Sequence, residues 1–321
     1  MKVLVGANPM GLEKAIPALR EQFPQVEFDY CPDRGDQLTA MIPDADIYMG
    51  WLGAEAFAAA KQLKWIQSPS SGVNMFLDIP ALREGDVLLT SASGTHAAAV
   101  AESAIGMILA ITRGLWRAIL DRPQKLWRPQ PIRAKMVELT GSTLGIIGCG
   151  AIGRALAQRA KGFDMRVVAV DLYPSPGTPN VDEFWGLDRL DDLLAISDYV
   201  VVLVPFTPQT VNMIDAAQLA KMKPSAILVG ISRGGIINQD ALVDALRSGQ
   251  LAYAALDVFM PEPLPAESPL WEVENLLMAP HIAGGTQLEG KYIIEIFTEN
   301  LKRFLAGTLP LRNQVNKQAG F

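Results

Sequence analysis

The stretch that decides the fold is TLGIIGCGAIGRALAQRAKGFDMRVVAVD, residues 143–171. Three glycines in it form the pattern G-x-G-x-x-G. An apolar run suited to a strand, Leu144–Ile147, precedes the pattern, and a helical segment over 151–161 follows it. A second strand-like run then ends at Asp171. The glycine pattern alone is weak evidence, but in this order of strand, loop, helix, strand and acid it predicts a dinucleotide-binding unit.

Each position in the pattern has a physical task. Gly148 lets the chain turn sharply out of the strand, and Gly150 lets the backbone approach a pyrophosphate closely. Gly153 allows the helix to pack tightly against the sheet. The helix that begins at Ala151 and Ile152 directs free N–H groups and its positive dipole end at the phosphates.

Asp171 bears on the choice of cofactor. Its carboxylate can accept hydrogen bonds from both adenosine ribose hydroxyls and would repel a 2′-phosphate, so the sequence favours NAD over NADP. The alternative interpretation is a glycine-rich turn in an α/β domain that binds no nucleotide.

The overall composition narrows the class of protein. The length of 321 residues predicts two domains, and a hydrophobic content of 50% allows large cores. The net charge of −6 argues against a nucleic-acid or anionic-membrane surface. The first residues, MKVLVGANPM, indicate a strand and no secretory signal. Two cysteines fit no disulfide framework and no metal site, and they suit a reducing cytoplasm.

Short apolar runs alternate with helical segments along the chain, which predicts parallel sheets covered on both faces. The expected fold class is α/β, with two Rossmann-like or flavodoxin-like doubly wound domains and a cleft between them. The first part holds four expected strands: Lys2–Val5, Asp46–Met49, Lys64–Gln67 and Val87–Thr90. Four more follow Asp171, giving six in the second sheet: Tyr199–Val204, Ala226–Val229, Tyr253–Leu256 and Leu276–Met278.

The helices define the expected domains. One long apolar helix is expected over Ala97–Ala118, followed by an irregular arm over Asp121–Lys135. A last amphipathic helix follows residue 284 and can return to cover the first domain. We therefore expect a discontinuous substrate domain, 1–97 plus 284–321, around an NAD-binding domain, 98–283. The arm and the long helix suggest a homodimer contact.

Three residues that can do chemistry follow three strands of the second domain. Arg233, Glu262 and His281 each lie in a loop at the carboxyl end of a strand, where open α/β sheets bind ligands. Arg233 or Glu262 taken alone is most simply a solvated surface group. His281 differs, because it lies in a rigid loop that allows close approach of a ligand. Together, beside a nicotinamide, they fit the reduction of a 2-oxo acid. Arg233 can hold the carboxylate and polarise the carbonyl, His281 can donate the proton, and Glu262 can orient the imidazole and favour its charged form.

A family resemblance covers nearly the whole chain. The motifs GCGAIG, SRGG, DVFMPEPLP and PHIAG occur in that order. They resemble the D-isomer-specific 2-hydroxyacid dehydrogenases, in which the motif arginine, glutamate and histidine are the catalytic set. The resemblance maps this set onto Arg233, Glu262 and His281. It also implies that Asp257 holds the nicotinamide carboxamide.

The resemblance extends to the substrate loop and the adenosine side. It implies that the backbone N–H groups of Ser71 and Gly72 bind the substrate carboxylate, in a loop where Asn74 replaces the usual aspartate. The run 204–210 matches the segment beside the adenosine. The complete set of predicted cofactor contacts is Gly148, Gly150, Ala151, Ile152, Gly153, Asp171, Val204, Pro205, Thr210, Ile231, Ser232, Arg233, Asp257, His281 and Gly284. The predicted substrate contacts are Ser71, Gly72, Arg233, His281 and Trp51.

Within the family the chain resembles most the glyoxylate/hydroxypyruvate reductase branch. LKWIQ, PAESPLW and the tail QVNKQAGF carry this resemblance, whereas Met260 stands where acids are common. That branch often uses NADPH, but the stretch after Asp171 has no nearby arginine. Oxidation of 3-phosphoglycerate is the alternative reaction, and it is disfavoured because 51–58 and 68–74 offer no cation for a phosphate. A non-catalytic NAD-sensing protein of the same fold is the alternative from another class.

Three further residues have two interpretations each. Trp51 either walls the substrate pocket or fills the core. His96 either reaches the cleft or is a partly exposed residue at a helix start. Cys149 lies near a helix N-terminus, which predicts a lowered thiol pKa, and its alternative role is that of a small buried filler.

Overall fold

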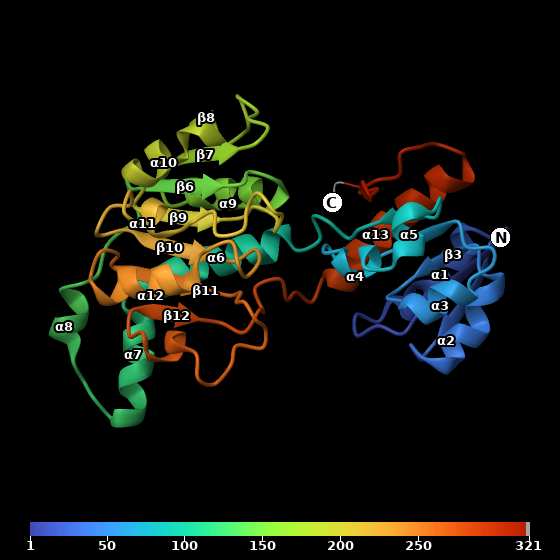
Figure 1. The fold of residues 1–321 in the computed structure, drawn as a ribbon, viewed down its shortest axis with the longest axis horizontal. Coiled ribbons are helices and arrows are strands. Elements are labelled where there is room, and N and C mark those ends of the chain that lie inside the picture. Colours follow the sequence, from blue (N-terminus) through green and yellow to red (C-terminus); the bar gives the residue numbers. More distant parts are fainter. Residues whose placement is uncertain (319–321) are drawn as a thin grey trace. The chain divides into compact units, whose positions relative to one another are not determined.

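The computed structural model describes residues 1–318. Its contacts divide the chain into two compact units. Unit one comprises Met1–His96 and the chain from Thr286 onward, and unit two comprises Ala97–Gly285. Each unit is an α/β structure built on a parallel sheet (Figure 1). The last three residues of the tail motif 314–321 lie outside the described residues.

Unit one holds five parallel strands in the order β2-β1-β3-β4-β5. Their bounds are β1 Lys2–Gly6, β2 Glu27–Cys31, β3 Ile47–Met49, β4 Trp65–Gln67 and β5 Leu88–Thr90. Its helices are α1 Ile16–Gln22, α2 Asp36–Met41, α3 Ala54–Ala59, α4 Asn74–Leu77, α5 Pro80–Glu84 and α13 Glu289–Leu305, with 3₁₀ turns at Leu12–Ala15 and Ile42–Asp44.

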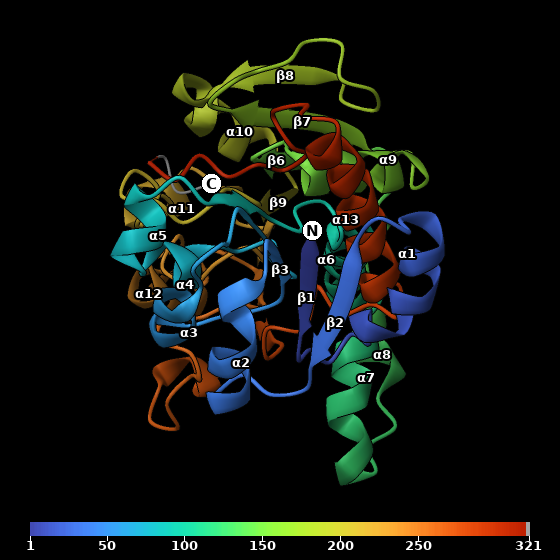
Figure 2. The same cartoon turned by 90° about the vertical axis from the view of Figure 1, so that its right-hand side faces the viewer.

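Side chains of successive strand residues point to opposite faces of the sheet in unit one, and each face is covered by its own layer of helices. Val3 and Val5 of β1 pack with α1 and α13, whereas Leu4 between them packs with α2 to α5 on the other face. Figure 2 shows these two groups of helices on either side of β1 and β2. The doubly wound sheet predicted for this unit is confirmed.

The strand β2 was missed by the sequence analysis. In its sequence, EFDYC, only Phe28 and Cys31 are buried, because β2 is the edge strand of the sheet. An edge strand with alternating polar residues lacks the continuous apolar run that marks a central parallel strand. The loop that follows β2 was therefore not recognised as part of the carboxyl edge of the sheet.

Unit two holds seven parallel strands in the order β12-β11-β10-β9-β6-β7-β8. Their bounds are β6 Thr143–Ile147, β7 Arg166–Asp171, β8 Glu183–Gly186, β9 Tyr199–Val202, β10 Ile227–Gly230, β11 Tyr253–Leu256 and β12 Leu276–Met278. Its helices are α6 Ala97–Thr112, α7 Leu115–Asp121, α8 Pro129–Arg133, α9 Ala151–Lys161, α10 Leu190–Ile196, α11 Ala216–Leu219 and α12 Gln239–Arg247. Three 3₁₀ turns lie at Arg122–Gln124, Leu187–Arg189 and Pro269–Glu272. Hydrophobic clusters cover both faces of the sheet.

Two expectations for unit two were wrong. The sheet has a seventh strand, β8, which is a half-buried edge strand without an apolar run. The helix expected over 97–118 is broken into α6 and α7 at Gly114, which adopts a φ of 66°. A Cβ at Gly114 would lie 2.3 Å from Cγ2 of Ile132, so glycine also allows the arm to pack there.

Within residues 1–318 no single helix is long and apolar enough to cross a membrane. Only α6 and the segment Leu115–Gln124 taken together have the length and composition of a membrane span, and these two are bent by 66° relative to each other.

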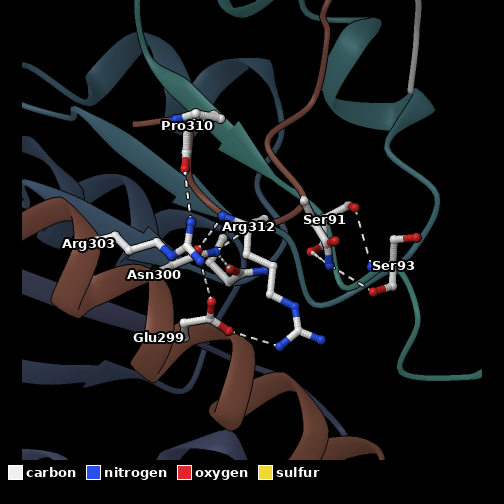
Figure 3. Close-up of polar contacts among 9 residues, drawn as sticks. Ser91, Ser93, Glu299, Asn300, Arg303, Pro310 and Arg312 are labelled. Carbon is white, nitrogen blue, oxygen red and sulfur yellow. Dashed lines mark hydrogen bonds and ion pairs between the residues drawn. The ribbon is translucent and has the colours of Figure 1, made fainter. Parts of the chain in front are cut away.

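The carboxy-terminal segment is tied to the end of β5 and to α13 (Figure 3). Asn300 is fully buried in α13, and it accepts the N–H of Arg312 at 2.7 Å and donates to the Arg312 carbonyl at 2.9 Å. Asn313 donates to the carbonyls of Ser91 and Ser93. The chain that leaves β5 is thereby held in a fixed position.

Candidate active site

The phosphate loop of unit two has the geometry expected of the glycine pattern. Gly148 adopts a φ of 92°, and a Cβ on it would lie 2.9 Å from the backbone nitrogen of Val204. A Cβ on Gly153 would lie 2.7 Å from the carbonyl oxygen of Gly148, which explains the tight helix-to-strand contact. Gly150 is different, because among residues 1–318 only its two chain neighbours have atoms within 4 Å of the place where its Cβ would be. This open position is where the backbone can be approached by a phosphate.

The start of α9 fits an anion. Gly150 is its N-cap, no side chain caps the helix, and its first turn holds no acid. The first N–H groups of α9 are therefore available to a ligand, as at other nucleotide-binding helix starts. Gly148, Gly150, Ala151, Ile152 and Gly153 are accordingly the residues that would hold the pyrophosphate of a dinucleotide.

Asp171, at the end of β7, binds the phosphate loop through its carboxylate. Its Oδ2 accepts the N–H of Cys149 at 2.8 Å, and its Oδ1 accepts the N–H of Tyr173 at 3.1 Å. The carboxylate is thus fixed beside the phosphate loop, and each oxygen retains further capacity to accept a hydrogen bond.

The pKa expected for Cys149 was wrong. Cys149 is 2% exposed, and burial raises the pKa of its thiol to about 11. Burial is the largest cause, because the thiolate would be taken out of water, and the charge of Asp171 acts in the same direction. Its alternative role, a small buried filler, is confirmed.

Two loops of unit two bring Glu262 and His281 together. The imidazole Nδ1 of His281 lies 2.7 Å from Oε2 of Glu262, and Oε1 of Glu262 accepts the N–H of Phe259 at 2.8 Å. Glu262 is therefore held at both oxygens, and it fixes the plane of the imidazole. With Nδ1 turned to the carboxylate, Nε2 is the ring atom left to exchange a proton with a ligand.

The charge of Glu262 is stabilised by the same contacts. Burial acts to raise the pKa of its carboxyl, but the hydrogen bonds from His281 and from the Phe259 N–H outweigh this effect. Arg233 contributes in the same direction by its charge. The pKa of Glu262 therefore lies below its ordinary value, and the carboxylate is ionised at neutral pH.

Arg233 lies in the loop after β10, and its Nη1 donates to the carbonyl of the neighbouring Ser232 at 2.7 Å. The following glycine sets the spacing of two loops. A Cβ on Gly234 would lie 1.8 Å from the carbonyl oxygen of Phe259, so only glycine permits this contact. The motif SRGG thereby brings the loop of Arg233 against the loop of Glu262.

Asp257 has a structural task that the sequence analysis did not find. It is 1% exposed, and its two oxygens accept the N–H groups of Ile282 and Ala283, each at 2.9 Å. Its backbone carbonyl accepts the N–H of His281 at 2.8 Å. His281 itself has a φ of 54°, so the loop is held in a conformation that non-glycine residues seldom adopt. Asp257 fixes the backbone from which His281 projects.

The other predicted cofactor positions lie on the loops that follow the central strands. Val204, Pro205 and Thr210 follow β9, and the Thr210 hydroxyl donates to the Pro205 carbonyl at 2.7 Å. Ile231 and Ser232 follow β10, and Gly284 follows His281 in the loop after β12. All of these loops leave the carboxyl edge of the parallel sheet, as the predicted site requires.

The predicted substrate loop of unit one follows β4. The carbonyl of Ser70 accepts the N–H of Ala92 at 2.9 Å, and the Ser71 hydroxyl donates to the Ala92 carbonyl at 3.2 Å. The N–H of Gly72 makes a long contact of 3.3 Å with Oγ of Ser70. The N–H of Ser71 makes no hydrogen bond to residues 1–318 and is available to a ligand.

Trp51 is half-buried at the carboxyl edge of unit one, where it packs against the hydrophobic cluster that contains Leu4. The guanidinium carbon of Arg34 lies 4.5 Å from the centroid of its ring. Arg34 was missed because it follows the unrecognised strand β2. His96 is also half-buried, and its Nε2 lies 3.6 Å from a carboxylate oxygen of Glu289.

Comparisons with known proteins agree with this geometry. Residues 105–283 match the family described as D-isomer specific 2-hydroxyacid dehydrogenase, NAD binding domain. The chain is 37% identical to a glyoxylate reductase of Thermofilum pendens over 88% of this chain and 84% of that protein. It is 35% identical to a D-3-phosphoglycerate dehydrogenase of Archaeoglobus fulgidus, over 98% of this chain but only 59% of the longer relative.

A solved structure resembles the whole chain. It is the NADPH-dependent glyoxylate/hydroxypyruvate reductase of Sinorhizobium meliloti in complex with NADP and sulfate, with a TM-score of 0.82 and 26% identity over 100% of both chains. The resemblance to this branch that the motifs suggested is confirmed. The chain belongs to the D-isomer specific 2-hydroxyacid dehydrogenases, oxidoreductases that transfer a hydride between NAD(P) and a small 2-hydroxy acid.

Proposed function

We propose that this protein is an NAD-dependent reductase of glyoxylate, hydroxypyruvate or a closely related 2-oxo acid, with Arg233, Glu262 and His281 as its catalytic set. The Glu262–His281 pair, 2.7 Å apart, carries the proposal. It is a fixed proton donor at the carboxyl edge of the sheet that also bears the phosphate loop.

The residues divide the work of the reaction. Arg233 binds the substrate carboxylate and polarises the neighbouring carbonyl. In unit one, the backbone N–H groups of Ser71 and Gly72 are the proposed donors to a substrate carboxylate. His281 donates the proton from Nε2 to the carbonyl oxygen in reduction and removes it in oxidation. Glu262 orients the imidazole through Nδ1. When bound, the nicotinamide supplies the hydride.

Turnover tests the proposal directly. Oxidation of NADH is followed at 340 nm with glyoxylate and hydroxypyruvate as substrates. His281→Ala should remove most turnover and leave NADH binding intact, and Arg233→Ala should raise KM and lower kcat together. Tight NADH binding without turnover of any 2-oxo acid would instead support a non-catalytic dinucleotide-binding protein.

The preference for NAD rests on Asp171. Two backbone N–H groups hold its carboxylate in place, so it cannot swing aside to admit a 2′-phosphate. The loop over 172–177 contains no lysine or arginine to bind such a phosphate. The relative from Sinorhizobium meliloti was crystallised with NADP, so the two cofactors must be compared. A higher kcat/KM with NADPH than with NADH would reject the preference.

A homodimer is proposed from the arm of unit two. Trp127 in the arm is 92% exposed, and Arg128 beside it forms an ion pair with the buried Asp121. Further exposed apolar residues lie on α7, on the arm and just after the arm: Leu115, Ile119, Leu120, Leu126 and Val137. The arm also borders a cavity of about 560 Å³. Light scattering should give the mass of a dimer for the wild type and of a monomer for Ile119→Glu combined with Trp127→Glu.

The cytoplasm is the proposed compartment. Cys31 and Cys149 are both buried and free, which suits a reducing environment.

A further inference from the structure

We propose that Arg34 forms a second anion-binding position in unit one, so that the preferred substrates are small 2-oxo acids with an additional anionic group at the far end. This inference rests on the reductase function proposed above and specifies its substrate class. The shared chemistry is a carboxylate or phosphate oxygen pair accepted by a guanidinium.

The placement of Arg34 is the first observation. It lies in the loop after β2, at the carboxyl edge of the sheet. Its Nε donates to the carbonyl of Ala7, which follows β1, at 3.1 Å. Its guanidinium carbon lies 4.5 Å from the ring centroid of Trp51, which follows β3. The side chain therefore extends from the edge strand across β1 to the loop that carries Trp51.

These two contacts orient the guanidinium and leave part of it unused. Stacking on an aromatic ring fixes the plane of an arginine, and the bond to Ala7 occupies Nε only. Within residues 1–318 no carboxylate lies within 4.0 Å of Arg34, so its terminal nitrogens have no ion-pair partner there. A planar pair of N–H donors matches a carboxylate or a phosphate.

The neighbouring acid does not neutralise Arg34. Oδ2 of Asp33 accepts the N–H groups of Gly35 and Gln37 at 3.0 and 3.2 Å, at the start of α2. These bonds lower the pKa of Asp33, so its charge is stabilised by backbone N–H groups. The acid is thus directed toward the helix.

Other cations of unit one are used differently. Lys2 pairs with Asp29 and Asp44, and Lys64 pairs with Asp46, at the amino edge of the same sheet. Arg303 and Arg312 both pair with Glu299. Arg34 is at the carboxyl edge, where the predicted substrate loop also lies.

The spacing of the strands gives the size of the ligand. The strands β3 and β4 are neighbours, and the N–H of Gly50 donates to the Gln67 carbonyl at 3.2 Å. Neighbouring strands lie about 4.8 Å apart, and Arg34 is hydrogen-bonded just after β1, which lies two strands from β4, so its guanidinium and the Ser71 loop are separated by roughly 10 Å. With C–C bonds of about 1.5 Å, two anionic groups joined by two or three carbons span roughly 4–6 Å, and a hydrogen bond of about 2.9 Å at each end extends this reach to roughly 10–12 Å.

Arg34 also changes the ranking of substrates made from the sequence. A phosphate-bearing substrate was disfavoured because 51–58 and 68–74 contain no cation. The cation stacked on Trp51 comes from a different loop, so that argument does not hold.

The experiment compares substrates that differ only in the far group. Rates of NADH oxidation are measured with glyoxylate, hydroxypyruvate, 2-oxoglutarate and 3-phosphohydroxypyruvate for the wild type, Arg34→Met, Arg34→Lys and Lys64→Met. Lys64→Met is the matched control, because it removes a cation at the opposite edge of the sheet. The quantity of interest is the ratio of kcat/KM for each dianionic substrate to that for hydroxypyruvate.

For the wild type we expect this ratio to exceed about ten for at least one dianion, which corresponds to one charge-assisted pair. Arg34→Met should lower it at least about tenfold, mainly through KM, and Arg34→Lys should restore only part of it. Lys64→Met should leave it unchanged. The dianionic substrate whose kcat/KM ratio falls most in Arg34→Met shows whether Arg34 binds a carboxylate or a phosphate.

Two results would overturn the inference while the reductase function stood: a wild type without preference for either dianion, and a ratio that Arg34→Met leaves unchanged. If no 2-oxo acid is reduced at all, the proposed function fails. Thermal stabilisation by 2-oxoglutarate or 3-phosphoglycerate in the presence of NADH then decides the anion position separately, because Arg34→Met must abolish it.

Discussion

The carbonyl oxygen of Phe259 lies against the α-carbon of Gly234 so closely that a Cβ there would be 1.8 Å away. This contact joins the loop of Arg233 to the loop in which Glu262 is bound to the Phe259 N–H. Three groups of the proposed catalytic set thus depend on one position without a side chain.

Gly234→Ala should therefore separate Arg233 from Glu262 and His281. The backbone must move by on the order of 1 Å, which can cost about 100-fold in rate. We expect kcat/KM to fall by about that factor, with NADH binding retained in fluorescence titrations. Gly106→Ala is the control, because a Cβ there meets no atom within 4 Å. Equal activity of the two variants would contradict the role of the contact.

Glu262→Gln tests the charge beside His281. The pKa of Glu262 is lowered in the folded chain, so its ionised form stabilises the fold above the ordinary value of 4.5. This contribution is lost as the pH falls through the lowered value. The difference in free energy of unfolding between wild type and variant should shrink as the pH falls below the ordinary value. Urea denaturation at several pH values measures it, and a difference that grows on acidification would disprove the assignment.

Asp257→Asn should destabilise the loop of His281. The amide accepts at one oxygen only, so one of the buried N–H groups of Ile282 and Ala283 loses its acceptor. The expected cost is about 1–3 kcal/mol of unfolding free energy. Urea denaturation measures the cost, and hydrogen exchange at Ile282 and Ala283 shows whether it is local. Unchanged exchange at both amides would mean that the carboxylate is not their acceptor.

Asn300→Leu tests the attachment of the carboxy-terminal segment. The variant leaves the N–H and carbonyl of Arg312 without their side-chain partner, at a cost of roughly 1–3 kcal/mol. We expect faster proteolysis after α13. Glu299→Gln is the control, since it weakens only exposed ion pairs, which contribute less than about 1 kcal/mol. Equal proteolysis of the two variants would contradict this role of Asn300.

Cys149 should resist alkylation. Its thiol is buried and has a pKa of about 11, so little thiolate is present at pH 8. Iodoacetamide should modify it slowly in buffer and rapidly in denaturant, whether or not NADH is present. Rapid modification of the folded protein, suppressed by NADH, would instead support the lowered thiol pKa that the sequence predicted for Cys149.

The elements that the sequence predicted best are those with one dominant signal. Central strands such as β6 and β10 are continuous apolar runs, because both faces of a parallel sheet are covered. Glycines at 148 and 153 follow from close backbone contacts that no other residue allows. The pairing of Glu262 with His281 follows from the parallel topology, which places their loops at one edge.

The sequence did not predict the features in which two physical effects oppose each other or in which a residue pattern fits two structures. The edge strands β2 and β8 carry polar residues on a solvated face, so their sequences resemble loops. The break at Gly114 could not be distinguished from a tolerated helical glycine. For Cys149 the helix end and burial act in opposite directions, and only the structure shows how deeply the thiol lies. Arg34 was missed with its strand.

The bond between Asp171 and the N–H of Cys149 has a practical consequence for redesign. Asp171, which would hydrogen-bond the ribose, also fixes the turn at Cys149 that would bind the pyrophosphate. Replacing it with a residue that cannot accept a hydrogen bond, in order to admit NADPH, would therefore loosen the phosphate loop as well as remove the repulsive charge. Asp171→Asn removes the charge and keeps one oxygen that can accept that N–H, so it is the natural first step toward an exchange of cofactor in this chain.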